Sequence, residues 1–198
     1  MKADKARLTA SFGRGSLAMI LALAGLAAAQ DTPIDVERSA ITIHVGKSGL
    51  LSAAGHEHWV NAPIARGFIR ESEPHVEFTV NTRAMTVKPD PKVDAKTPEQ
   101  IQQDMQEMTL DSGKYAKITF ESKRVERSGD GWKVEGTLTL HGVSKTVNLN
   151  VTKDGDAYTS RFTLKQTDFG IKPVSVGAGM VKVKDQVEIE FHIVPKGS

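Results

Sequence analysis

The chain has 198 residues and a nearly balanced charge, with 26 Lys and Arg against 24 Asp and Glu, and it contains no cysteine. The lack of cysteine excludes disulfide bonds, thiolate metal sites, a cysteine nucleophile and the lipid-modified cysteine of bacterial lipoproteins. The balanced charge leaves no basic stripe that would indicate a nucleic-acid partner.

The first 29 residues are predicted to be a secretory signal peptide. Four basic residues precede an apolar run at 17–28 that is too short to span a bilayer comfortably. The small residues that end this run suit signal peptidase, and we expect cleavage after Ala29. The mature chain, residues 30–198, is then one domain by size. We expect it to be located in the periplasm and to have no stable membrane insertion. A retained N-terminal anchor helix is the alternative interpretation.

Alternation of apolar and polar residues predicts three strands in the first part of the mature chain. They cover 41–45, then 59–70 with an interruption at Pro63, then 76–80. A loop containing two prolines follows at 88–94.

One short helix is predicted over about 97–110. Thr97 suits the helix cap, Pro98 suits the first helical position, and Gln100 stands three residues after the cap. Met105 and Met108 continue the pattern at helical spacing. Because methionine makes adaptable apolar contacts, we interpret this helix as a lid or plug on one end of the fold.

Five more strands are predicted after the helix, at 117–127, 136–140, 147–151, 157–165 and 186–194. The second and third of these form a hairpin whose turn is His141–Gly142. A sheet of about eight strands with one apolar face has to bury that face. The fold class is therefore all-β, and a closed antiparallel barrel or a sandwich satisfies the pattern.

Three stretches of the sequence match motifs of a known family. They are Gly136–Lys145 (GTLTLHGVSK), Lys117–Ser122 (KITFES), and Asp168–Ile171 (DFGI) with the later Val187–Ile189 (VEI). In their chain order, which begins with the motif at 117–122, and behind a signal peptide, they resemble the YceI-like family of exported bacterial proteins. The resemblance implies that residues 30–198 form an eight-stranded antiparallel lipocalin-like barrel.

The same resemblance implies a class of ligand. A long amphiphilic isoprenoid-type lipid, either a polyprenyl compound or an isoprenoid quinone, is expected inside the barrel for storage or transport. The family is not known as one of catalysts, so we expect no enzymatic activity and no cofactor besides the bound lipid. The oligomeric state stays open, a homodimer included.

The apolar faces of the predicted strands are the candidate lining of a lipid cavity. The alternative is that these side chains simply fill the barrel, which would then act only as an interaction module, because eight strands leave little room inside. The candidate lining residues are Ile41, Ile43, Val45, Val76, Phe78, Val80, Ile118, Phe120, Leu138, Leu140, Val147, Leu149, Phe162, Leu164, Val187, Ile189 and Phe191.

Polar residues near the cavity mouth are the candidate headgroup ligands. A cavity for an oily ligand commonly carries a few polar groups that orient it. The residues selected for this role are His44, His56, His58, Trp59 and Asp168. An alternative is a metal-binding protein or an enzyme built on the His56 and His58 pair, with His44 or His75 as a third ligand.

Overall fold

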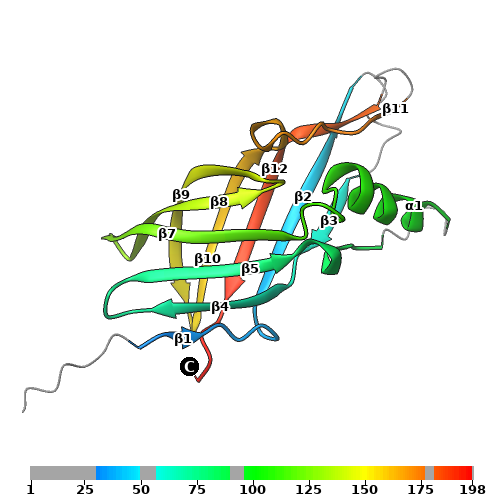
Figure 1. The fold of residues 1–198 in the computed structure, drawn as a ribbon. Helices are drawn as coiled ribbons and strands as arrows, with labels where there is room; N and C mark the ends of the chain where they lie inside the picture. The colour runs from blue at the N-terminus through cyan, green and yellow to red at the C-terminus, as the bar shows by residue number, and fades with distance from the viewer. Residues whose placement is uncertain (1–29, 50–56, 90–95, 177–180, 198) are drawn as a thin grey trace, which may run out of the picture.

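The computed structural model describes residues 30–49, 57–89, 96–176 and 181–197. Over these ranges the strands form a 12-stranded antiparallel sheet with the order β1-β4-β5-β7-β8-β9-β10-β12-β2-β3-β6, in which β11 pairs with β12 (Figure 1). The strands are β1 (Thr32–Pro33), β2 (Ala40–Ser48), β3 (His58–Asn61), β4 (Ile64–Arg70), β5 (His75–Asn81), β6 (Thr86–Val87), β7 (Lys117–Ser128), β8 (Gly131–Leu140), β9 (Val143–Asp154), β10 (Ala157–Lys165), β11 (Ser175–Val176) and β12 (Val181–Ile193).

The sheet curls on itself because β3 and β4 are two parts of one extended segment. β3 pairs with β2, β4 pairs with β5, and only Ala62 and Pro63 separate them. Counting β3 and β4 as one bent strand, and setting aside the two-residue strands β1, β6 and β11, gives the eight strands that the sequence predicts. At one end, the N–H of Ile34 donates to the carbonyl of Gly67, and the N–H of Asp35 donates to that of Val194. These bonds connect the region after β1 to both β4 and the end of β12.

The hairpin predicted around His141 and Gly142 is present. β8 ends at Leu140 and β9 begins at Val143, so the turn has two residues, and their φ angles are 51° and 75°. Positive φ at both central residues is the geometry that matches the twist of two paired strands. The local sequence therefore fixes the register of this part of the sheet.

The predicted helix is present, with slightly different bounds. α1 spans Lys96–Asp104 and continues as a π-helical turn, η3, over Met105–Thr109. The helix begins one residue before the predicted cap, Thr97. Pro98 still lies in the first turn, where a backbone N–H has no partner within the helix, so the proline is tolerated.

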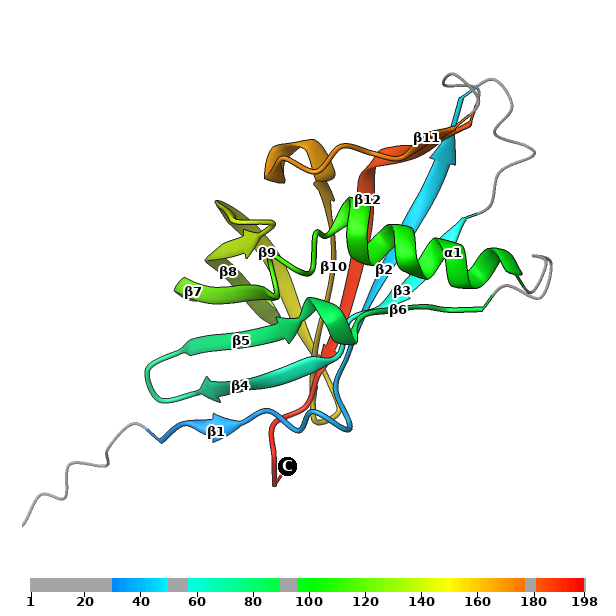
Figure 2. The same ribbon diagram turned by 45° about the vertical axis from the view of Figure 1, so that its right-hand side comes forward.

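Two glutamines hold this helix against the sheet. The amide of Gln102 donates to the carbonyl of Met85 (2.9 Å) and accepts from the N–H of Val87 (2.8 Å). The amide of Gln106 donates to the carbonyl of Thr82 (2.9 Å). In Figure 1 the helix lies at the right and the β4–β5 turn at the left, and Figure 2 shows the helix beside β3 and β6. The helix therefore closes one end of the curled sheet.

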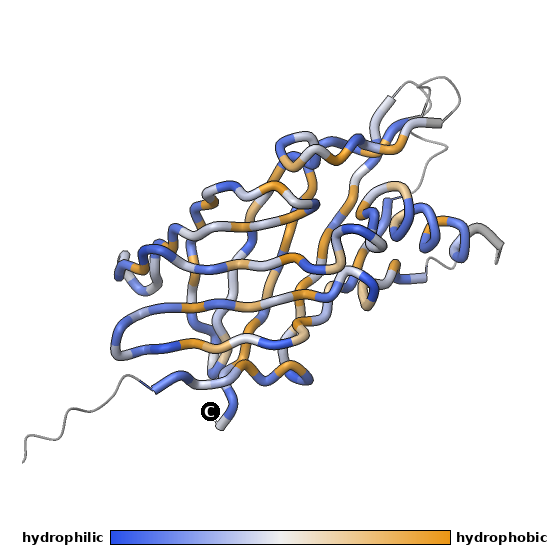
Figure 3. The backbone as a smooth tube through the Cα atoms, viewed as in Figure 1, coloured by the Kyte–Doolittle hydropathy of each residue, from blue (hydrophilic) through white to orange (hydrophobic). Residues whose placement is uncertain are grey.

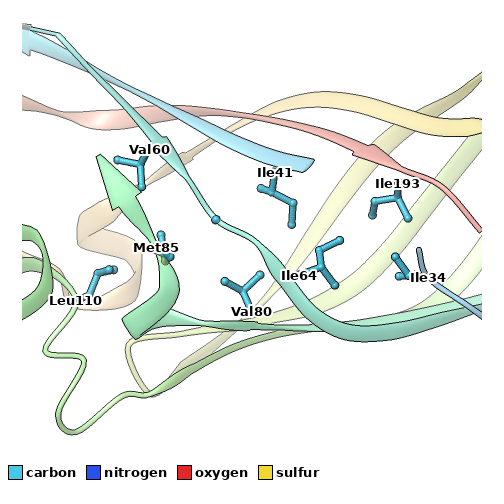
Figure 4. Packing of buried hydrophobic residues seen from close by; sticks show 9 residues of the cluster. Ile34, Ile41, Val60, Ile64, Val80, Met85, Leu110 and Ile193 are labelled. Atoms are coloured by element: carbon cyan, nitrogen blue, oxygen red, sulfur yellow. The ribbon is translucent and has the colours of Figure 1, made fainter. Parts of the chain in front are cut away.

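Apolar and polar residues alternate along the strands, as Figure 3 shows. The buried apolar residues form two clusters. One gathers near α1 and the first strands, and Figure 4 shows its side chains pointing toward one another. The other gathers around β7, β8 and β9 and includes Phe120, Val134 and Leu149. The interior of the curled sheet is thus apolar where these two clusters lie.

Candidate ligand-binding cavity

The interior contains two adjoining cavities. The first, here called the inner chamber, has a volume of about 140 Å³ and reaches Met105 and Thr109 of η3. The second, the outer chamber, has a volume of about 450 Å³ and reaches Glu71 and Pro74 of the β4–β5 turn. The wall between them is shared, because the same side chains line both chambers: Phe78, Phe120, Leu149 and Phe191.

The predicted apolar lining coincides with these walls. All of the predicted positions except Val76 lie on the inner chamber, and Val76 lies on the outer chamber. The sequence missed several other residues of the inner wall, because they lie in the helix or beside bends of the chain: Val60, Ala62, Met85, Met105, Thr109, Leu110, Gln166 and Ile171. The interior is therefore a space with apolar walls and not a filled core.

Met105 and Met108, which the sequence placed together on a lid, differ in position. Met105 lines the inner chamber, whereas Met108 is 71% exposed. Both residues belong to the π-helical turn, of which only one side faces the sheet, and Met105 lies on that side. Only Met105 can therefore contact a ligand in the inner chamber.

A pair of phenylalanines divides the two chambers. Phe78 of β5 and Phe120 of β7 are directly opposite in the sheet, and their rings stack with centroids 5.4 Å apart. The Phe120 ring occupies space that a glycine leaves empty. A Cβ atom added to Gly136 would lie 2.4 Å from Cζ of Phe120 and 2.8 Å from the carbonyl oxygen of Glu121. The position of the Phe120 ring therefore depends on the absence of a side chain at Gly136.

Polar groups gather where the outer chamber meets solvent. The Tyr158 hydroxyl donates to the Glu71 carboxylate over 2.6 Å. Burial, followed by this hydrogen bond and the Glu71 charge, raises the pKa of Tyr158 to about 12. His75 also lines the outer chamber, and its Nδ1 lies 3.2 Å from the hydroxyl of the buried Ser122. The side chains of Tyr158, Glu71 and His75 form the polar rim of an apolar cavity.

Cations and aromatic rings alternate along this rim. The Arg127 guanidinium lies 4.5 Å from the centre of the Trp132 ring, and the Lys153 ammonium lies 5.1 Å from that of Tyr158. The two rings meet edge to face with centroids 5.4 Å apart. Arg70 also lines the outer chamber, and its Nε donates to Asp31 over 2.8 Å. Stacking of this kind holds a cation in place while its N–H groups still face solvent.

The Tyr158 hydroxyl gives a prediction about pH. A pKa of about 12 in the folded protein, against 10.0 unperturbed, means that the protonated phenol stabilises the fold. This contribution is complete below pH 10 and is lost as the pH rises toward 12. In a Tyr115→Phe background Tyr158 is the only tyrosine left. Its tyrosinate absorbance should then titrate well above pH 10, and Glu71→Gln should lower that midpoint without returning it to 10, because burial is the larger cause. An unchanged midpoint in Glu71→Gln would contradict the assignment of this hydrogen bond.

The predicted headgroup residues that the structure describes line neither chamber. Ile43 and Val45 face the interior, so His44 between them faces outward. His44 stacks on Trp59 with ring centroids 4.4 Å apart, and its Nε2 lies 3.1 Å from a carboxylate oxygen of Glu57. The period-two rule already implies this outward direction once Ile43 and Val45 are placed inside.

The two remaining described residues selected for the headgroup, His58 and Asp168, lie in different elements. His58 lies in β3 and lines neither chamber, and Asp168 is exposed in the short 3-10 helix η4 (Gln166–Phe169). His56 lies outside the described residues. Within the described ranges, no group of three or more His, Cys, Asp or Glu side chains could hold a metal ion. In the same part of the chain, no helix is both long and apolar enough to cross a membrane.

Some of the rim residues that sequence analysis missed follow the same alternation as the predicted lining. Tyr158 is in phase with Leu164 on β10, and Lys153 is in phase with Leu149 on β9. Arg127 does not follow it, because a bulge in β7 between Ser122 and Arg124 changes the phase after Phe120. Extending the inward faces of β9 and β10 would therefore have found Lys153 and Tyr158, whereas Arg127 required the structure.

Comparison with known proteins agrees with this architecture. The profile of the YceI-like domain family matches residues 33–194. A UPF0312 protein of Shewanella sp. (strain W3-18-1) is 30% identical over 159 residues, which cover 74% of this chain and 79% of the relative.

Two solved structures share the fold at low sequence identity. Burkholderia cenocepacia BcnA is 19% identical with a TM-score of 0.55, over 82% of this chain and 99% of BcnA. A polyisoprenoid binding domain from Saccharophagus degradans, implicated in plant cell wall breakdown, is 13% identical with a TM-score of 0.57, over 83% of this chain and 97% of that domain. These structures show a shared fold, and the profile match over residues 33–194 shows that the chain belongs to the YceI-like family, as the three sequence motifs predicted.

Proposed function

We propose that this protein is an exported binding protein that holds a long amphiphilic isoprenoid-type lipid inside its curled sheet, for storage or transport. The observation that carries the proposal is the apolar, two-chamber interior. The outer chamber alone, at about 450 Å³, falls in the range of about 300–1,000 Å³ that is usual for ligand cavities. The similar fold of the Saccharophagus degradans polyisoprenoid binding domain supports the same class of ligand.

The two chambers suit the two parts of such a lipid. The inner chamber is lined almost entirely by aliphatic and aromatic side chains, so it suits a hydrocarbon tail. Each buried methylene contributes about 0.8 kcal/mol, and the gain over several isoprene units exceeds the cost of ordering the tail. The polar rim of the outer chamber suits a headgroup. The tail therefore enters first and points toward α1.

Export belongs to the same proposal. The expected signal peptide, residues 1–29, lies outside the described residues, and the periplasmic location stays a prediction from its sequence. Expression of the full chain in a Gram-negative host, followed by fractionation and mass measurement of the product, tests it. The expected product is a periplasmic protein that begins at Gln30. A cytoplasmic protein that retains residues 1–29 would contradict the prediction.

Native mass spectrometry tests the lipid cargo directly. The purified protein is expected to carry an adduct of several hundred daltons, about the mass of a chain of several isoprene units, that organic extraction removes and that an added polyprenyl lipid restores. As a control, Leu149→Glu should remove the adduct, because it places a carboxylate on the wall that both chambers share. Asn148→Glu places the same charge on the neighbouring exposed position and should keep it. A protein that neither carries nor accepts any lipid would refute the function.

A further inference from the structure

The charges on the rim of the outer chamber bear on the chemistry of the headgroup. We infer that the bound lipid has an anionic, phosphate-type headgroup, held at the outer rim by Arg127 and Lys153. This inference rests on the proposed function and deepens it, because an isoprenoid lipid can equally carry a neutral headgroup such as an alcohol or a quinone.

The first observation is the balance of charge among the lining residues. Arg70, Arg127 and Lys153 line the outer chamber, together with a single carboxylate, Glu71. Cations still outnumber carboxylates when Asp31, the partner of Arg70, is included. The inner chamber has no charged lining residue within the described part of the chain. Positive charge is therefore concentrated at the end of the cavity where a headgroup would lie.

The second observation is how the two rim cations are held. Among the described residues, neither Arg127 nor Lys153 forms a salt bridge with a carboxylate. Each lies instead over an aromatic ring, Trp132 for Arg127 and Tyr158 for Lys153. Ring stacking fixes the two cations beside each other without neutralising them. Their N–H groups stay available to an anion from outside the protein.

The third observation concerns the one carboxylate of the lining. Glu71 accepts the hydroxyl proton of Tyr158 in a hydrogen bond of 2.6 Å. This hydroxyl is protonated at neutral pH, as an unperturbed tyrosine with a pKa of 10.0 already is. The hydrogen-bond donor to Glu71 is thus a neutral hydroxyl, and among the described residues neither Arg127 nor Lys153 forms a salt bridge with Glu71. A phosphate headgroup can therefore accept charge-assisted hydrogen bonds from Arg127 and Lys153. The hydrogen bonds from these two residues to a neutral headgroup would be weaker.

The test compares two lipids that differ only in the headgroup. The purified, delipidated protein is titrated with a polyprenyl phosphate and with the polyprenol of the same chain length, and binding is followed by tryptophan fluorescence. The phosphate is expected to bind at least about tenfold more tightly, since a charge-assisted hydrogen bond typically corresponds to that factor or more. The preference should shrink as salt is added, because the rim is exposed.

Variants locate the effect on the rim. Arg127→Gln with Lys153→Gln should remove most of the preference for the phosphate, so that the dissociation constants of the two lipids come within about twofold of each other. The matched control is Arg124→Gln with Lys145→Gln, which removes the same charge from exposed positions on the same two strands, β7 and β9, that line neither chamber. This control should keep the preference.

Several outcomes would overturn the inference, and they are distinguishable. Equal binding of the phosphate and the alcohol would refute the anionic headgroup and leave lipid binding intact. Inorganic phosphate that binds as tightly as the polyprenyl phosphate would show a site for free anions instead of a headgroup site. Failure of both lipids to bind would refute the proposed function itself, and the inference with it.

Discussion

Replacing Gly136 by alanine is expected to abolish tight binding of long-tailed lipids while leaving binding of short-tailed ones. The new methyl group would take the space now held by the Phe120 ring, whose Cζ lies 2.4 Å from the position of that methyl. The ring then has to turn into the lumen, where it narrows the passage that Phe78 already restricts. Excluding even two methylenes from the inner chamber weakens binding by about tenfold, at about 0.8 kcal/mol each.

A titration with polyprenols of increasing length measures this effect. Wild-type affinity should rise with each added isoprene unit, whereas the affinity of Gly136→Ala should stop rising once the outer chamber is full. The crowded wall should also lower the free energy of unfolding by about 1–3 kcal/mol. Gly113→Ala is the matched control, since nothing lies closer than 4.0 Å to the Cβ it would add. An affinity that rises with tail length in Gly136→Ala as it does in wild type would show that Phe120 does not control the passage.

Replacing Phe120 by alanine is expected to have the opposite effect on the cavity and the largest effect on stability. Phe120 is 4% exposed, and truncation of a buried phenylalanine lowers the free energy of unfolding by about 3–5 kcal/mol. We expect a value near the lower end, because the ring borders empty space in both chambers and makes fewer contacts than a fully packed ring. The same truncation joins the two chambers into one.

Added lipid should therefore restore stability in this variant. A long-tailed lipid is expected to raise the melting temperature of Phe120→Ala more than that of wild type, because the joined cavity accepts the tail without displacing a ring and ligand binding stabilises the folded state. Phe68→Ala makes the same chemical change at a position that lines neither chamber, and it should show no extra stabilisation by lipid. A lipid-induced shift in Phe120→Ala that is no larger than in wild type would contradict the role of the phenylalanine pair as a partition.

The two experiments also separate the partition from the rim. Changes at Gly136 and Phe120 alter the dependence of affinity on tail length, whereas changes at Arg127 and Lys153 alter its dependence on the headgroup. If tail and headgroup occupy separate parts of the cavity, the two sets of effects should be additive, whereas coupled effects would show that the partition and the rim act on the same part of the ligand.

The histidines show where sequence interpretation went furthest from the structure. A pair at His56 and His58, with His44 nearby, suggests a polar site by residue type alone. Residue type gives no direction, whereas the alternation of the strand does: His44 lies between two inward residues and faces outward against Trp59 and Glu57. The alternation along the strand therefore excludes His44 from the cavity lining, although its residue type suggests a ligand-binding role.

Local patterns determined much of this protein. The alternation of apolar and polar residues was sufficient for the eight principal strands, the hairpin turn at His141–Gly142, the helix near 97–110 and the part of the inner wall that the strands supply. Each of these depends on residues that are close in the sequence, and a side chain on a strand faces one side or the other by a rule with a period of two.

Tertiary structure alone decided how those faces divide the interior. Phe78 and Phe120 form a partition because β5 and β7 pair in a register that places them directly opposite, although a helix and a loop separate them in the chain. Arg127 pairs with Trp132 across one hairpin and Lys153 pairs with Tyr158 across another, but only the curl of the sheet makes both pairs part of one cavity rim. Register and closure are set by contacts between distant segments. No periodicity within a single strand encodes which partner it will face, and so the shape of the cavity emerges only when the sheet has curled.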